Sequence, residues 1–248
     1  MENTQKSIGR QIKFDVITIF PEMFTDFSGR GVFARAKSSK IIDLNIHDLR
    51  DYSNDKHRKV DDYPFGGGPG MIIRPDVVER ALLSINSNNS PKSHRVYLSP
   101  SGKSLNQEKL GNLAKMEKIT ILCGRFEGVD QRAIDVLGFE EISIGDYVLA
   151  GGEIAAQVLL EGCIRLIPGV LGHPKSLLEE SFSNNLLEYP HYTRPKSWED
   201  SLGKKHDVPE VLTSGHHGNI KTWRHNKSVE KTKNIRPDLF NKKEKKQD

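Results

Sequence analysis

The chain has 248 residues, of which 35% are hydrophobic and 28% charged, and its formal net charge is +4 at pH 7. This length is typical of one or two domains with a sizeable core, and the composition excludes a collagen-like or wholly disordered chain. No apolar run reaches the roughly 18 residues of a membrane span, and residues 1–11 are too polar for a secretory signal. The two cysteines, Cys123 and Cys163, form no disulfide framework or metal cluster. We therefore expect a soluble protein of a reducing compartment, with no membrane partner.

The charge is unevenly distributed along the chain. Residues 191–248 carry 14 Lys and Arg against 8 Asp and Glu, a net charge of +6, which leaves −2 for residues 1–190. A near-neutral body followed by a basic tail favours a polyanionic partner such as nucleic acid. A solvated tail without a partner is an equally good interpretation of charge alone.

The first 170 residues alternate between strand and helix patterns. Strands are predicted over 13–19 (half-buried), 42–46, 95–98, 118–122 and 141–144. Helices are predicted from Pro75 to Ile85 and over 104–115, 129–137 and 154–166. Strands that alternate with helices of about ten residues are typical of a parallel sheet covered by helices, so we expect an α/β fold.

The pattern changes after Pro168. Residues 169–187 are rich in Gly, Ser and Asn and resemble a linker, while 208–213 and 215–233 have helical patterns without strands between them. Arg224, Lys227 and Lys231 are spaced to share one helix face. We predict an α/β domain over 1–171, a linker over 172–187 and a small, basic, all-helical domain over 188–248.

Three glycine-containing segments follow predicted strands, over 99–102, 123–128 and 145–152. Loops beyond the carboxyl ends of parallel strands converge on the ligand crevice, and glycine lets the backbone approach a flat ligand. Three in succession favour a ligand pocket. The phosphate-binding motifs do not fit, because Tyr97 stands where a P-loop requires its first glycine, and the glycine run 66–70 does not open a helix directly.

The long segment 51–71 and Arg165 each have two interpretations. The long segment 51–71 is a surface excursion or, as we favour, a lid or binding loop. Arg165 ends an apolar helix, where a cation pairs with the helix dipole, or it points into a cleft; taken alone, the first interpretation is preferred. Glu180 is by default a solvated carboxylate. The adjacent His216 and His217 lack supporting ligands, so no metal site is predicted.

Eight sequence strings, in order along nearly the whole chain, resemble the bacterial tRNA (guanine-37-N1)-methyltransferase family of the SPOUT superfamily. They are Ile19-Phe20-Pro21-Glu22-Met23-Phe24, Val60-Asp61-Asp62 with the run 66–71, Tyr97-Leu98-Ser99-Pro100, Cys123-Gly124-Arg125, the run 143–149, the run 167–172, the run 190–195 and Ser214-Gly215-His216-His217.

The resemblance implies a fold that pattern reasoning does not reach, since knots are nearly absent from proteins. In that family the glycine loops form a trefoil knot that binds S-adenosylmethionine, the methyl donor, and the protein is a cytoplasmic homodimer with active sites between its subunits. The donor-binding residues implied here are Tyr97, Leu98, Ser99, Pro100, Gly124, Ile144, Gly145, Asp146, Tyr147, Val148, Leu149, Gly151 and Gly152.

The resemblance also implies the chemistry. The family's catalytic arginine maps onto Arg165, and its catalytic aspartate maps onto Glu180, whose arm is one methylene longer. Phe126 is a second departure, because the family commonly has tyrosine there. A magnesium requirement is implied, with Glu127 a nearby carboxylate. The implied tRNA contacts are Arg194, His216, His217 and Arg224.

Two alternatives to the N1-methyltransferase remain. Another knotted RNA methyltransferase, acting on a ribose 2′-hydroxyl, needs no base matched to N1, but the strings near the carboxyl terminus count against it. A non-catalytic RNA-binding relative binds tRNA without the donor, but the complete set of donor-loop strings counts against that interpretation.

Overall fold

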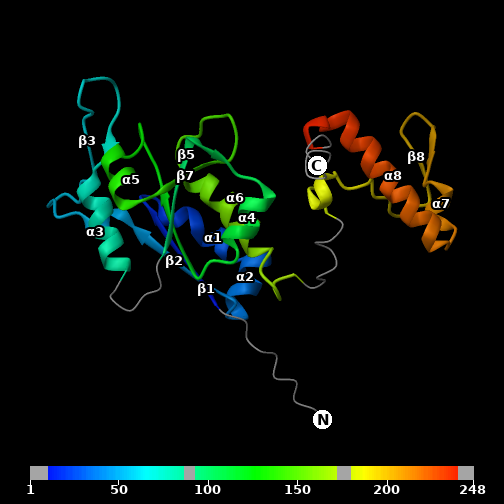
Figure 1. Cartoon of the computed structure of the whole chain (residues 1–248), viewed down its shortest axis with the longest axis horizontal. Coiled ribbons are helices and arrows are strands. Elements are labelled where there is room, and N and C mark those ends of the chain that lie inside the picture. Colours follow the sequence, from blue (N-terminus) through cyan, green and yellow to red (C-terminus); the bar gives the residue numbers. More distant parts are fainter. Residues whose placement is uncertain (1–10, 87–92, 172–179, 240–248) are drawn as a thin grey trace, which may run out of the picture. The chain divides into compact units, whose positions relative to one another are not determined.

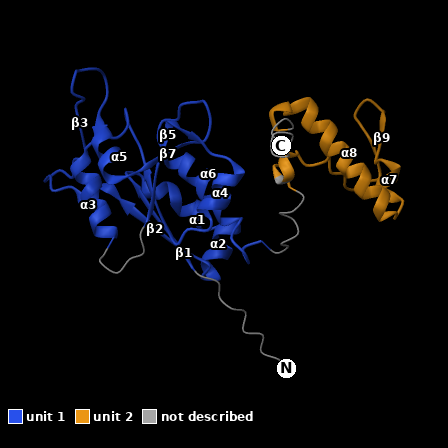
Figure 2. Ribbon diagram, viewed as in Figure 1, with its two compact units in different colours: residues 1–172 blue, residues 173–248 orange. Residues whose placement is uncertain are grey.

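A computed structural model describes residues 11–86, 93–171 and 180–239 of the chain. The chain divides into two compact units, residues 1–172 and 173–248, coloured separately in Figure 2. The first unit holds the predicted sheet and its helices. The second is built around one long helix. In the described ranges, no helix combines the length and the apolar character needed to cross a membrane.

The first unit contains a five-stranded parallel sheet, which confirms the predicted α/β class (Figure 1). Its strands stand in the order β2-β1-β6-β5-β7, and neighbours pair in parallel. Their bounds are β1 (Ile12–Thr18), β2 (Ile42–Asp48), β5 (His94–Ser104), β6 (Lys118–Cys123) and β7 (Glu140–Ser143). The carboxyl ends of these strands all lie at the same edge, where the glycine-containing segments 123–128 and 145–152 begin.

Helices cover both faces of this sheet. One face packs on α1 (Thr25–Ser28), α2 (Gly31–Ser38), α4 (Gln107–Leu113) and α6 (Glu153–Ile164). The other packs on α3 (Pro75–Ile85) and α5 (Gln131–Leu137). Short elements complete the unit: the 3₁₀ turns η1 (Pro21–Phe24) and η2 (Leu49–Tyr52), and the paired strands β3 (Asp61–Asp62) and β4 (Ile72–Ile73).

The predicted helices form for recognisable local reasons. In α3, Pro75 occupies the first turn, where its missing N–H costs nothing, and the apolar residues recur on the buried face. In α5, the Asp130 carboxylate caps the amino end by accepting from the Arg132 N–H at 2.9 Å, and Gly138 ends the helix in the left-handed conformation. These signals explain why both helices fall within two residues of their predicted bounds.

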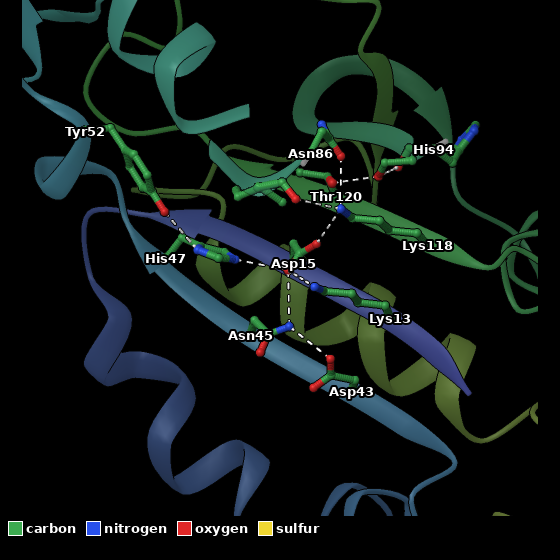
Figure 3. A network of polar contacts seen from close by, with 12 residues as sticks. Lys13, Asp15, Asp43, Asn45, His47, Tyr52, Asn86, His94, Lys118 and Thr120 are labelled. Carbon is green, nitrogen blue, oxygen red and sulfur yellow. Dashed lines mark hydrogen bonds and ion pairs between the residues drawn. The ribbon is translucent and has the colours of Figure 1, made fainter. Parts of the chain in front are cut away.

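Strand β1 is more deeply buried than its sequence suggests. The alternation of polar and apolar residues predicts a half-buried strand, but Asp15 is 0% exposed, and six of the seven strand residues are buried. That prediction was wrong because both faces of a parallel sheet are covered by helices. Asp15 is accommodated there by a polar network, shown in Figure 3, rather than by solvent.

The network joins three neighbouring strands and the end of α3. The Lys118 ammonium, also 0% exposed, lies 3.3 Å from Asp15 Oδ2 and donates to the Ile85 carbonyl and the Asn86 side chain. On the other side, His47 Nε2 lies 3.1 Å from Asp15 Oδ1. Burial raises the pKa of Asp15, but the His47 hydrogen bond and the nearby lysine charges outweigh it and hold the pKa below 3.8.

The second unit contains α8 (His217–Ile235), α7 (Glu210–Thr213), the 3₁₀ turn η4 (Ser183–Asn185) and an antiparallel hairpin. The hairpin joins β8 (Ser197–Glu199) to β9 (Lys205–Asp207), with the Trp198 and His206 rings stacked at 5.2 Å. The prediction of an all-helical domain was therefore wrong. Both strands have three residues, all exposed, so they lack the buried alternation that marks a strand in sequence.

The predicted linker 172–187 is described only from residue 180 onward. Leu186 is buried in the second unit, and the Leu187 N–H donates to the Thr232 hydroxyl of α8 at 2.8 Å. Residues 180–187 therefore pack as part of this unit. The rest of the predicted linker, residues 172–179, lies outside the described residues.

Candidate active site

The three glycine-containing segments line one cleft of about 300 Å³ at the carboxyl edge of the sheet. Of the thirteen residues implied as donor-binding, twelve line it; Asp146 is not among the described lining residues. The twelve are Tyr97, Leu98, Ser99, Pro100, Gly124, Ile144, Gly145, Tyr147, Val148, Leu149, Gly151 and Gly152. Segments far apart in sequence thus converge on one concave surface, as the topology of an open parallel sheet requires.

The first wall of the cleft is an excursion from strand β5. Leu98 and Lys103 both pair with Ile142 of β7, so residues 99–102 leave the ladder and return to the same partner. Gly102 makes this possible, because a Cβ there would lie 2.4 Å from the Ile142 backbone nitrogen. The predicted loop after residue 98 is in fact a bulge within a longer strand.

Gly102→Ala is expected to weaken binding of the cleft's ligand by at least tenfold, since backbone atoms of β7 leave no room for the methyl group. Calorimetry with S-adenosylmethionine measures this. The matched control is Gly111→Ala on α4, where a Cβ meets nothing within 4 Å and alanine favours the helix. Equal affinities for the two variants contradict the assignment of this wall.

The floor of the cleft is buried, whereas its rim is apolar and exposed. Tyr97 is 9% exposed, and burial and the Glu141 charge raise the pKa of its phenol, so the ring stays neutral at physiological pH. At the rim, Tyr147 and Val148 are 54% and 83% exposed. Such a surface suits a ligand with flat, apolar parts held by backbone polar groups.

The segment 51–71 contacts the cleft through its last residues. The Glu127 N–H donates to the Met71 carbonyl at 3.0 Å, and a Cβ on Gly70 would lie 2.4 Å from the Glu127 side chain. Tyr63 and Phe65, near the middle of the segment, are 78% and 99% exposed. The preferred interpretation as a lid or binding loop stays a prediction.

Arg165 and Glu180 lie in different units. Arg165 follows α6 directly, is half-buried, and is not among the described residues that line the cleft. Glu180 lines a separate cavity of about 500 Å³ in the second unit. Their proposed joint action stays a prediction.

The cavity of the second unit also includes two of the implied tRNA contacts, His217 and Arg224. The Arg224 guanidinium lies over the Tyr189 ring, 4.7 Å from its centroid, and Lys221 stands on the same wall. Leu186, Leu187 and Ile220 add apolar surface. Arg194 and His216 are exposed and do not belong to the described lining.

No group of three or more His, Cys, Asp and Glu side chains is placed to hold a metal ion within the described ranges. Glu127, the carboxylate implied for magnesium, lines the cleft without such companions. The described residues therefore do not fit a site that holds magnesium through protein ligands alone. Both cysteines are buried, and burial raises the pKa of Cys163 to about 12, so its thiol stays protonated.

A model of the tRNA (guanine-1)-methyltransferase TrmD family matches residues 12–242, which include both units. The chain belongs to this family. It is 50% identical to the tRNA (guanine-N(1)-)-methyltransferase of Ruminiclostridium cellulolyticum, over 93% of this chain and 97% of that one. It is 48% identical to the protein of the same name from Ehrlichia canis, over 92% and 95% of the two chains, and 46% identical to that of Clostridioides difficile, over 93% and 98%.

Family membership confirms the resemblance that the eight strings indicated, and the family is one of enzymes. The sequence analysis did not select Arg125 and Glu127 as donor-binding, although both line the cleft. The string Cys123-Gly124-Arg125 contained the signal for the arginine. Nothing in the sequence singled out Glu153, which lies buried directly beside the cleft.

Proposed function

We propose that this chain transfers the methyl group of S-adenosylmethionine to N1 of guanosine 37 in tRNA. The observation that supports this most is the convergence of twelve implied donor-binding residues on one cleft, in a chain that belongs to the tRNA (guanine-1)-methyltransferase family. The proposed substrate is a cytoplasmic RNA, so we expect the protein to act in the cytoplasm.

The cleft fits the donor. The backbone at Gly145, Gly151 and Gly152 carries no Cβ, and a Cβ at each would meet another atom within 3 Å. Only glycine fits at these positions, so the loops pack closely together around the cleft, and the apolar rim can cover the flat face of an adenosyl group. The bound donor supplies an electrophilic methyl group on a positively charged sulfur. The protein's contribution is to orient it and to exclude water.

The acceptor must be made nucleophilic, because N1 of neutral guanine carries a proton. Loss of that proton moves negative charge onto O6, so the reaction needs a carboxylate base and a cation close to O6. We assign these roles to Glu180 and Arg165. The longer arm of glutamate keeps the acid function that the family's aspartate supplies.

We further propose that the active unit is a homodimer with a trefoil knot in each subunit. On α6, Ile154 and Val158 are 48% and 47% exposed although they stand one turn apart on a mostly apolar helix. An apolar stripe beside the cleft suits a second copy of the chain. In this proposed dimer, Glu180 of one subunit and Arg165 of the other come within reach of one another. The two residues then need not meet within one chain.

The basic second unit is proposed to bind the tRNA. Lys221→Ala is expected to weaken tRNA binding about three- to tenfold and to lower the slope of log affinity against log salt by about one, since one phosphate contact is lost. Titrations at several salt concentrations measure both. Lys37→Ala, an exposed lysine of α2 in the first unit, is the matched control. An unchanged slope for Lys221→Ala removes that lysine from the interface.

The decisive experiment incubates the protein with labelled S-adenosylmethionine and unmodified tRNA and maps the modified nucleotide. Methylation at N1 of guanosine 37 is expected, and a tRNA with adenosine at position 37 should stay unlabelled. Label on a ribose 2′-hydroxyl supports the other knotted methyltransferase. Binding of tRNA without binding of the donor supports the non-catalytic relative.

A further inference from the structure

Four residues from three segments of the chain form a closed ring of contacts beside the cleft. The Phe20 N–H donates to the Thr18 hydroxyl, which in turn donates to Glu153 Oε1, each at 2.9 Å. The other carboxylate oxygen, Oε2, lies 3.6 Å from Arg125 Nη1. The ring closes where the Arg125 guanidinium lies over the Phe20 ring, 4.6 Å from its centroid. A hydrogen bond thus holds one oxygen of Glu153, and the charge of Arg125 faces the other.

Glu153 and Arg125 differ in what they can reach. Glu153 is 1% exposed and does not line the cleft, so it cannot touch a ligand there. The Arg125 side chain is 27% exposed and is the one cation among the described residues that line the cleft. An effect of Glu153 on a ligand therefore has to be indirect, and Arg125 is the charged group of the lining through which it can act.

The backbone above the pair allows little movement. Arg125 forms a bridge with Gly151, and a Cβ on Gly151 would lie 2.4 Å from Glu153 Oε2 and 2.5 Å from Arg125 Nη1. Glu153 and Arg125 therefore pack directly against the backbone of the third glycine-containing segment, residues 145–152. A guanidinium that contacts a carboxylate, an aromatic face and a backbone loop can adopt only a narrow range of orientations.

Stability alone does not require a charge at Glu153. A buried carboxylate is costly, and the Thr18 hydroxyl, Arg125 and the amino end of α6 offset that cost. Glutamine keeps the shape of this side chain and can accept the same Thr18 hydrogen bond, and Arg125 is partly exposed, so solvent can replace the lost charge contact. The charge of Glu153 is better explained by its effect on the orientation of Arg125.

We propose that Glu153 is a positioning residue that holds the Arg125 guanidinium toward the carboxylate of the bound methyl donor. This rests on the proposed function, since it assumes that the cleft binds S-adenosylmethionine. The donor's amino acid portion is its anionic part, and a fixed guanidinium binds a carboxylate with two parallel hydrogen bonds. Glu153 sets the direction of those bonds without touching the donor.

Calorimetry with S-adenosylmethionine on the full chain tests this. Glu153→Gln is expected to raise the donor Kd at least tenfold while the melting temperature stays within a few degrees of wild type. Arg125→Ala is expected to raise the Kd at least as much. Because Glu153 acts through Arg125, adding Glu153→Gln to Arg125→Ala should change the Kd less than twofold further. Glu161→Gln, an exposed glutamate on the same helix, should leave the Kd unchanged.

Independent effects of the two substitutions, or an unchanged Kd for Glu153→Gln, overturn the inference. If Glu153→Gln does not fold, Thr18→Val gives the same test through the other carboxylate oxygen. Its donor Kd should rise about threefold in the wild-type background and stay constant in Arg125→Ala. Wild-type protein that binds no donor contradicts the proposed function itself, whereas normal wild-type binding with an insensitive Glu153 contradicts only this inference.

Discussion

Arg165→Ala is expected to slow methyl transfer about 10²- to 10³-fold, as the loss of a group that stabilises developing negative charge does in other enzymes. The side chain is assigned to the acceptor guanine, and it is not among the described residues that line the donor cleft. The donor Kd should therefore stay within about twofold of wild type. Single-turnover methylation of tRNA and calorimetry with the donor measure the two quantities.

Comparison with two other variants makes this result specific. Arg35→Ala, an exposed arginine of α2, should leave both quantities unchanged. Glu180→Gln should slow the transfer by a similar factor, and the double variant should be little slower than either single one, because the two groups act on the same proton loss. Undiminished transfer by Glu180→Gln favours the ribose methyltransferase. Equal losses of transfer and donor affinity in Arg165→Ala show that the arginine is misassigned.

Asp15→Ala is expected to lower the free energy of unfolding by about 3–5 kcal/mol, the typical cost of removing one partner from a buried ion pair. The Lys118 ammonium, whose contact with Asp15 is drawn in Figure 3, then stays buried without its counter-charge. Urea denaturation at pH 7 measures the change. Asp43→Ala on β2, a partly exposed neighbour in the same network, should cost less than about 1 kcal/mol.

The same aspartate gives the protein a defined response to acid. Its pKa is lower in the folded chain than the ordinary value of 3.8, so ionisation of its carboxyl group stabilises the folded state. This contribution is present in full above about pH 5, where Asp15 is ionised in the unfolded chain as well, and it is lost as the pH falls through the folded pKa. Wild type should therefore lose more stability than Asp15→Asn between pH 4 and pH 2. Parallel losses in the two proteins exclude this contribution.

The sequence predicted those parts of the fold whose apolar residues follow a helix or strand pattern and pack in the core. Helix α3 has its predicted bounds, because its apolar spacing and Pro75 act locally. The hairpin β8–β9 was missed, because none of its residues is buried. Asp15 misled the interpretation of β1, since its burial depends on Lys118 and His47, which lie far away in the sequence.

The candidate site, like the fold, could be predicted from the sequence only in part. Glycine-containing segments after strand ends indicated the cleft, because strand polarity fixes where those ends lie. Arg165 and Glu180 were selected by family resemblance alone, since each also has an ordinary structural role. Glu153 could not be found, because an acidic residue in the first turn of a helix is ordinarily an exposed partner of the helix dipole. Its burial became visible only with Thr18 and Arg125 around it.

Because residues 99–102 leave the ladder of strand β5 and return to it, the length of this cleft wall can change without changing how the strands of the sheet pair. Since Leu98 and Lys103 share the partner Ile142, a residue inserted between Ser99 and Gly102 would turn no strand side chain from one face to the other. The wall is therefore a suitable place to enlarge the cleft by design, for example to admit synthetic sulfonium donors with bulkier transferable groups. Few positions in a parallel sheet allow such an insertion without shifting every later pair.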